Sequence, residues 1–193
     1  MNAWLRVCGL LAIGSAAVAF GGGFANGPQA HPLAWQADAW LSRPWTLWTA
    51  AWVHPSAGSL LGNLLAVGAL AVLGAWLRLE RAAAAALVIA WPLSMLGLLL
   101  WPEVLAYAGL GAPIHAAAMV VWAQLAFRPD AKPLSFALFA GMALKLLAEQ
   151  AWLQPVGFEP AWGVNVVVGA HLTGAAAGMA CGVVAVLAAG FRK

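Results

Sequence analysis

The stretch that decides the fold is GAHLTGAAAGMACG, residues 169–182. Small residues recur in it at every fourth position, at Ala170, Gly174, Gly178 and Gly182. Positions four apart share one face of an α-helix, and a stripe of small residues lets the backbone of a neighbouring helix approach closely. We therefore expect this helix to pack against a partner helix, with His171 beside the head of the stripe.

The composition of the whole chain is that of a membrane protein. Of the 193 residues, 64% are hydrophobic and only 8% are charged, and the mean hydropathy is +0.88. In soluble domains about a quarter of all residues are charged. Because this fraction is so much lower here, we expect the lipid bilayer to surround most of this chain. The net charge of +3 is too small to indicate a nucleic-acid partner. Cys8 and Cys181 lie inside apolar runs, which favours helix packing over a disulfide.

Six apolar runs are long enough to cross a bilayer as helices, which takes roughly 17 to 25 residues. Helices are expected because hydrocarbon does not tolerate unpaired backbone amides, and no run shows the alternating period of a barrel strand. We predict an all-α polytopic membrane protein, a single domain over residues 1–193. Its six transmembrane helices span about residues 4–20, 57–77, 82–101, 111–127, 134–153 and 164–190.

Cationic residues lie mostly at one end of this predicted bundle. The end that holds both termini contains Arg6, Arg78, Arg81, Arg128, Lys132, Arg192 and Lys193. The opposite end has only Arg43, so the positive-inside rule predicts cytoplasmic termini. The first helix, with an apolar core followed by the sequence AVA at 17–19, also has features of a cleavable signal peptide. We expect this first helix to be retained. Its removal would leave five spans and would put the loop with Arg78 and Arg81 on the side that the positive-inside rule does not predict.

Several residues of the apolar runs are predicted to lie at a similar depth in the membrane. In the predicted topology the second, fourth and sixth helices all begin on the outer side. The outer half of the bilayer therefore holds His54, Gly111, His115 and His171, which one site could gather. Each polar side chain also has a purely structural interpretation, because a histidine, or Asn63, can simply hydrogen-bond two helices together.

Lys145 and Glu149 lie inside the fifth predicted helix, one turn apart, and can neutralise each other on one face. Their order, with the lysine first, is the less favourable one for such a pair. Structural pairing is the simpler interpretation, and a proton relay remains an alternative.

Three stretches together resemble the rhomboid family of intramembrane serine proteases, in particular its small bacterial type with six helices. They are RPWTLWTAAWVHPSAGSLLGNLL (43–65), YAGLGAPIHAAAM (107–119) and the stretch at 169–182, and the resemblance covers about residues 40–185. In the first stretch Trp45, His54 and Asn63 follow one another at nine-residue intervals. The third stretch matches the family pattern A-H-x-x-G-x-x-x-G in full. The resemblance implies an integral protein of the bacterial inner (plasma) membrane.

The resemblance also implies a serine–histidine dyad, in which His171 is the general base and Asn63 contributes to the oxyanion hole. The family's serine lies in a G-x-S-G motif at the mouth of the fourth helix. Aligning Gly109 with the first glycine of that motif puts Gly111 on the serine position. This chain therefore keeps the base and lacks the nucleophile.

Other positions depart from the family pattern. Ser59 stands where many members have a second histidine near the oxyanion site, and Thr46 stands where a Trp-Arg pair is common. His115 lies one turn below Gly111 on the same helix face, where the family commonly has an aromatic residue or histidine that packs against the catalytic histidine.

We therefore expect a rhomboid-like membrane protein without protease activity, which binds transmembrane segments of client proteins and needs no cofactor. One alternative is an active intramembrane serine endopeptidase with an atypical nucleophile, for which Ser59 is the candidate nearest the site. Another is a metal-binding or transport protein that uses His115 and His171, with His54 as a further ligand. No inverted repeat typical of carriers is visible. The sequence leaves the oligomeric state open.

Overall fold

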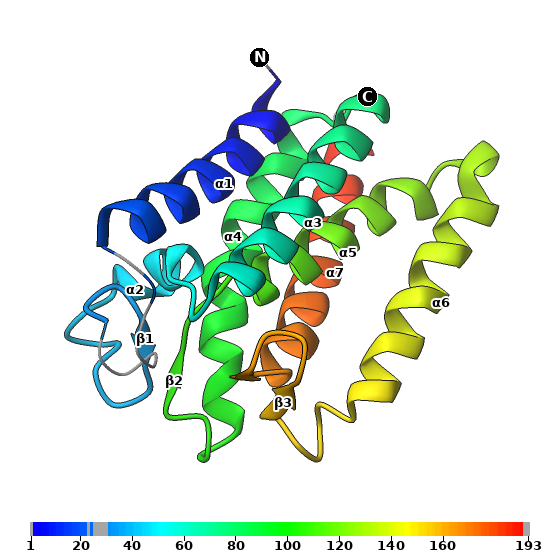
Figure 1. The fold of residues 1–193 in the computed structure, drawn as a ribbon. Coiled ribbons are helices and arrows are strands. Elements are labelled where there is room, and N and C mark those ends of the chain that lie inside the picture. Colours follow the sequence, from blue (N-terminus) through cyan, green and yellow to red (C-terminus); the bar gives the residue numbers. More distant parts are fainter. Residues whose placement is uncertain (1, 23, 25–30, 191–193) are drawn as a thin grey trace.

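The computed structural model describes residues 2–22, 24 and 31–190, which form a bundle of helices (Figure 1). Its long helices are α1 (Ala3–Gly22), α3 (Ala57–Trp76), α4 (Arg81–Gly97), α5 (Gly111–Ala126), α6 (Lys132–Glu149) and α7 (Gly169–Gly190). Shorter pieces are α2 (Thr46–Thr49) and the 3-10 turns η2 (Ala50–Trp52), η3 (Leu98–Leu100) and η4 (Pro129–Ala131). Strands in the described residues form only two short antiparallel pairs, so the fold is all-α, as expected.

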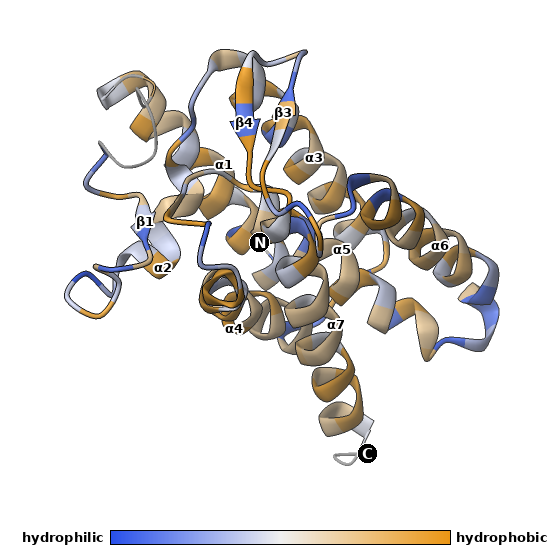
Figure 2. Ribbon diagram, turned by 90° about the horizontal axis from the view of Figure 1, so that it is seen from below, coloured by the Kyte–Doolittle hydropathy of each residue, from blue (hydrophilic) through white to orange (hydrophobic). Residues whose placement is uncertain are grey.

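Five of these helices are long and apolar enough to cross a membrane, judged by length and composition: α1, α3, α4 with η3, α6 with η4, and α7. Large apolar side chains such as Ile13, Leu65 and Leu144 are exposed on them, and Figure 2 shows hydrophilic residues mainly in the connecting segments. These features are consistent with an integral membrane protein. The sixth apolar helix, α5, has 16 residues and spans about 24 Å, less than the hydrocarbon core of ~30 Å.

Helix boundaries agree with prediction to within a few residues, except between α6 and α7. The sequence predicts helix over 150–153, but α6 ends at Glu149 because Gln150 adopts the left-handed conformation, with φ of 49°. The sequence also predicts that the last helix starts at 164. Instead, β4 (Val164–Val166) pairs with β3 (Gly157–Glu159), and α7 begins at Gly169. Four of the five residues 164–168 are valines, whose β-branched side chains favour a strand.

The small-residue stripe of α7 packs directly on the backbone of α5. A Cβ atom added to Gly174 would overlap the carbonyl oxygen of Ala112, and one added to Gly178 would overlap that of Ala116. The partner expected for this stripe is therefore α5, the fourth of the predicted helices. This contact fixes the beginning of α7 beside the beginning of α5.

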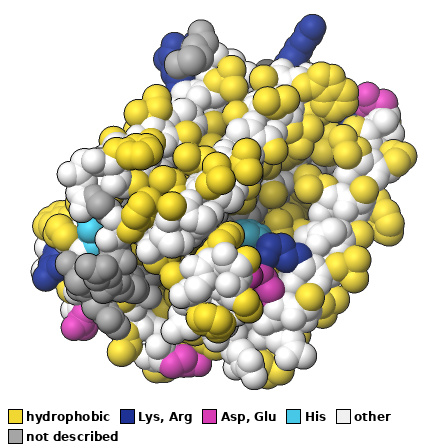
Figure 3. All heavy atoms as spheres, viewed as in Figure 1, with side chains coloured by type: hydrophobic (Ala, Val, Ile, Leu, Met, Phe, Trp, Pro, Cys, Tyr) yellow, Lys and Arg dark blue, Asp and Glu magenta, His cyan; other side chains and the backbone are white. Residues whose placement is uncertain are grey.

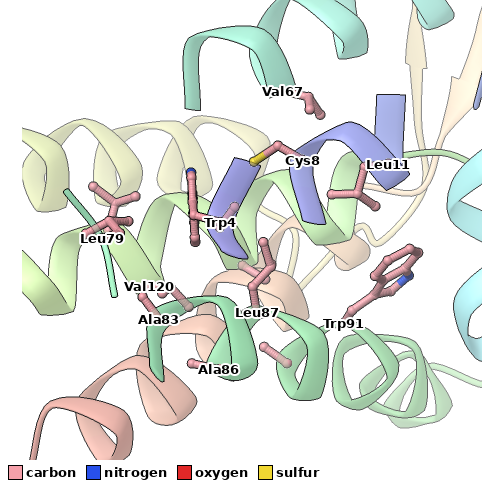
Figure 4. Packing of buried hydrophobic residues seen from close by; sticks show 14 of the residues in the cluster. Trp4, Cys8, Leu11, Val67, Leu79, Ala83, Ala86, Leu87, Trp91 and Val120 are labelled. Carbon is pink, nitrogen blue, oxygen red and sulfur yellow. The ribbon is translucent and has the colours of Figure 1, made fainter. Parts of the chain in front are cut away.

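A buried cluster joins α1 to α3 and α4 (Figure 4). Trp4 is fully buried, and its indole N–H donates to the carbonyl oxygen of Leu70 on α3 at 2.9 Å. Cys8 and Leu11 continue the buried face of α1 in the same cluster as Val67 of α3 and Leu87 of α4, with Cys8 near Val67, and Cys8 is a free thiol. The buried cluster thus anchors α1 to the bundle.

Helix α6 lies at the edge of the bundle (Figures 1 and 2). Ser135 is its only buried residue, and apolar side chains such as Phe136 and Leu144 are exposed. Near its beginning, Phe139 packs on Trp122 of α5 with ring centroids 5.4 Å apart. Its other end contacts α7 through polar side chains, which belong to the candidate site.

Candidate functional site

The candidate site lies where α5 and α7 begin and where α6 ends. Just before α5, the strand β2 (Ala106–Tyr107) pairs with β1 (Trp35–Gln36). The chain then turns through Gly109, whose φ of 123° is rarely adopted by residues with a side chain. The N–H of Gly109 donates to the carbonyl oxygen of Ala50 at 2.9 Å, which ties this turn to η2. The turn delivers Gly111 as the first residue of α5.

Gly111 lies against the imidazole of His171. A Cβ atom added to Gly111 would stand 2.9 Å from Nε2 of His171 and 3.2 Å from the hydroxyl oxygen of Tyr107. The structure thus brings together the two positions that the sequence analysis aligned with a nucleophile and its base. It also shows that the ring is closer to α5 than a side chain at residue 111 would comfortably allow.

The ring of His115 stacks on the ring of His171. Their centroids are 4.1 Å apart and their planes differ by 15°. Nδ1–H of His115 donates to the carbonyl oxygen of Gly111 at 2.6 Å, so this histidine is fixed to its own helix. The stacking holds the His171 ring in one orientation. This agrees with the interpretation of His115 as a residue that packs against His171.

An acidic side chain from α6 completes the surroundings of His171. Nδ1 of His171 lies 2.9 Å and 3.0 Å from the two carboxylate oxygens of Glu149. Glu149 also pairs with Lys145, as predicted, and the Lys145 ammonium lies 3.5 Å from Nδ1 of His171. Figure 3 shows basic, acidic and histidine side chains meeting at the foot of a hollow that α6 borders. From the sequence, Glu149 was expected to pair with Lys145 alone, and its contact with His171 was not predicted.

The contact with Glu149 determines which nitrogen of His171 carries hydrogen. A carboxylate can only accept a hydrogen bond, so Nδ1 is the donor. In the neutral ring Nε2 then has the free lone pair, and Nε2 is the atom that faces Gly111. The imidazole is therefore oriented as a general base, but the residue in front of it has no side chain.

Tyr107 is a further member of this group that the sequence analysis did not single out. Its hydroxyl oxygen accepts a hydrogen bond from the N–H of Ala112 at 3.0 Å, in the first turn of α5. Burial raises the pKa of Tyr107 far above its usual range, so the phenol is neutral. Its role in the geometry is to support the first turn of α5 beside His171.

The structure does not connect the remaining predicted site residues to His171. His54 is buried, its Nδ1 donates to the carbonyl oxygen of Trp52 at 3.2 Å, and burial lowers its pKa. Ser59 is buried in the first turn of α3, where its N–H donates to the capping hydroxyl of Ser56. Within the described ranges no hydrogen bond joins Ser59 or His54 to His171, and the amide of Asn63 makes none.

A hairpin between α6 and α7 covers the beginning of α3. Its Trp162 lies so close to α3 that a Cβ atom on Gly58 or on Gly62 would stand 3.2 Å from the indole ring. These two glycines flank Ser59 and precede Asn63, so the hairpin lies over the segment that the resemblance assigned to the oxyanion hole. The spacing of four between the glycines is the sequence signal that predicts such a flat docking face.

The metal-binding alternative finds little support in this geometry. No group of three His, Cys, Asp or Glu side chains in the described part of the chain is arranged to hold a metal ion. His115 and His171 stack face to face, and both of their Nδ1 atoms are engaged by oxygen atoms.

Comparisons with known proteins give no identification: no family model, no curated protein and no solved structure matches this chain.

Proposed function

We propose that this protein is a rhomboid-like integral membrane protein that binds transmembrane segments of client proteins without cleaving them. One observation carries the proposal: Nε2 of His171, oriented as a base by Glu149, faces the backbone of Gly111. A base in this position needs a hydroxyl or thiol to activate. Loss of the nucleophile from such a site normally costs several orders of magnitude in rate.

Other serines are poorly placed to substitute. The hydroxyl groups of Ser15 and Ser94 are buried and donate to carbonyl oxygens of Ala51 and Trp91. Ser59, the candidate nearest the site in the sequence analysis, makes no hydrogen bond to His171. These contacts support an inactive site over an active one with another nucleophile.

Client binding is supported by the weak attachment of α6. Most large side chains of α6 are exposed, and its contacts with the bundle are mainly those of Leu138 and Phe139 and of the Glu149 group at its end, which leaves an apolar face beside the His171 group. Another transmembrane helix can pack there by van der Waals contact and interhelical hydrogen bonds, the interactions that associate helices within a bilayer. In this proposal all six long helices cross the bacterial inner membrane, with both termini in the cytoplasm.

The absence of proteolysis is tested with purified protein in detergent. We expect no cleavage of a rhomboid reporter substrate and no labelling by a fluorophosphonate probe, with an active rhomboid protease as the positive control. Labelling or cleavage that disappears in both the His171→Ala and Ser59→Ala variants would overturn this part of the proposal.

Client binding is tested separately, in membranes, with a photo-crosslinking amino acid at an exposed position of α6. Leu144 is the test position and Ile13 on α1 is the matched control, because their side chains are 67% and 72% exposed. We expect adducts with other membrane proteins from position 144 and few from position 13. Equal yields at the two positions, or lipid adducts alone at position 144, would contradict client binding along α6.

A further inference from the structure

A groove between α5 and α6 lies at the opposite end of α6 from the His171 group. Its volume is about 380 Å³, and it is lined by Trp122, Ala126, Lys132, Ser135, Phe136 and Phe139. Lys132 and Glu149 are the first and last residues of α6, so the two places are about 25 Å apart along the helix. The groove is therefore a separate site.

The lining of this groove changes from polar to aromatic along its length. Lys132 and Ser135 lie in the first turn of α6, and Phe139 lies one turn further on. On the α5 side, Ala126 is at the polar end and Trp122, one turn back, packs on Phe139. The distance from the polar end to the aromatic end is about 10 Å along α6. A ligand that fits this lining has a polar head and an apolar tail.

Ser135 has a hydroxyl group that the described part of the chain leaves available. The residue is 5% exposed, and its hydroxyl makes no hydrogen bond within the described residues. The hydroxyl oxygen is not among the fully enclosed polar atoms without a partner in the described residues, so it is accessible from the groove and can donate or accept a hydrogen bond there. Because Ser135 lines the groove, a ligand there can make a hydrogen bond with this hydroxyl group.

Lys132 supplies a positive charge at the same end. Its ammonium group donates to the carbonyl oxygen of Ala126, the last residue of α5, and retains further N–H donors. In the described part of the chain it forms no ion pair, although Asp130 lies in the adjacent η4. Arg128, in the same connection, donates to the carbonyl oxygen of Leu77. This end of the groove is therefore complementary to an anion.

We propose that this groove binds an anionic phospholipid. Its phosphate is held by the ammonium group of Lys132 and the hydroxyl of Ser135, and one acyl chain lies against the aromatic residues. Basic pockets between membrane helices are known to take anionic lipid headgroups. The groove is too small for a second helix, which is 10–12 Å wide with its side chains, whereas its volume suits a single chain. The lipid would add to the apolar contacts that α6 makes with the bundle through Leu138 and Phe139.

The inference rests on insertion in a bilayer and not on the function proposed above. The headgroup contact is tested by native mass spectrometry of the full-length protein in mild detergent, titrated with phosphatidylglycerol or phosphatidylcholine. We expect Lys132→Gln to weaken phosphatidylglycerol binding about fivefold, the effect of one lysine near a phosphate, which is about 1 kcal/mol. Arg81→Gln is the matched control, because Arg81 is an exposed cation at the beginning of α4 and does not line the groove. Equal losses in both variants, or equal binding of the two lipids, would overturn the proposal.

The position of the acyl chain is tested with a phosphatidylglycerol that carries a photoreactive group in one chain. We expect its adducts on the α5 and α6 residues of the groove and their loss in Ser135→Phe, which fills the groove. A larger groove between α1 and α3, of about 490 Å³ and with only apolar residues, glycine and Cys8 in its lining, is the internal comparison. Adducts confined to that groove, or a groove filled by a client protein, would overturn the assignment.

Discussion

At the scale of single residues, the site consists of a well-oriented imidazole beside a glycine. The sequence predicted that His54, Gly111, His115 and His171 lie at one level, where one site could gather them, and the resemblance paired residues 111 and 171. The structure brings Gly111, His115 and His171 together, whereas in the described residues no hydrogen bond joins His54 to them. The sequence did not predict the contact of Glu149 with His171. Glu149 lies on another helix, α6. Which face of α6 turns toward the bundle depends on its packing against the other helices, and the sequence of one apolar helix does not indicate that face. Glu149 is nevertheless the group that directs Nε2 toward Gly111.

The narrow space at Gly111 leads to a prediction about restoring the family's serine. We expect Gly111→Ser to destabilise the protein by about 1–3 kcal/mol, the usual cost of overpacking, because its Cβ would stand 2.9 Å from a ring held by two partners. Gly141→Ser on α6 is the matched control, since a Cβ there meets no atom within 4 Å. Thermal unfolding in detergent measures both variants. An unchanged melting temperature for Gly111→Ser, with rapid fluorophosphonate labelling, would contradict this prediction. It would show that the His171 ring moves aside at little energetic cost.

At the scale of helices, the close contact of α7 with α5 was predictable and the ends of α6 and α7 were not. A stripe of small residues has a clear periodicity, and its physical meaning does not depend on the partner. Apolar composition alone, in contrast, does not separate helix from strand in the run VNVVV at 164–168, where β-branched side chains prevail over hydrophobicity. The hairpin over α3 was missed for the same reason.

The small-residue stripe of α7 leads to a prediction about Gly178, for which a glycine on another long helix is the matched control. Alanine at Gly178 would put its Cβ onto the carbonyl oxygen of Ala116, so we expect Gly178→Ala to cost about 1–3 kcal/mol despite the better helix propensity of alanine. Gly68→Ala on α3 meets no atom within 4 Å and should leave stability unchanged or raise it by up to about 1 kcal/mol. Both are measured by thermal unfolding in detergent. Equal melting temperatures would mean that α5 and α7 are not in backbone contact.

At the scale of the whole molecule, the main question is whether α5 crosses the membrane. The described chain begins and ends at the same end of the bundle (Figure 1), as an even number of crossings requires. Arg128, after α5, donates to the carbonyl oxygen of Leu77 at the end of α3, so these two connections meet at one end. Both facts fit six crossings, although the 16 residues of α5 are fewer than most spanning helices have.

A full-length chain with single cysteines on either side of α5 decides the number of crossings. Cys8 and Cys181 are first replaced by alanine, and Glu103→Cys and Asp130→Cys, both at exposed positions, are then introduced separately. If α5 crosses, a membrane-impermeant maleimide labels position 103 in intact cells and position 130 only after the membrane is opened. This orientation follows from the cations beside position 130, Arg128 and Lys132, and their absence beside position 103. Labelling of both positions from the same side would mean five crossings. The termini would then face opposite sides, which contradicts the ends of the bundle seen in the structure.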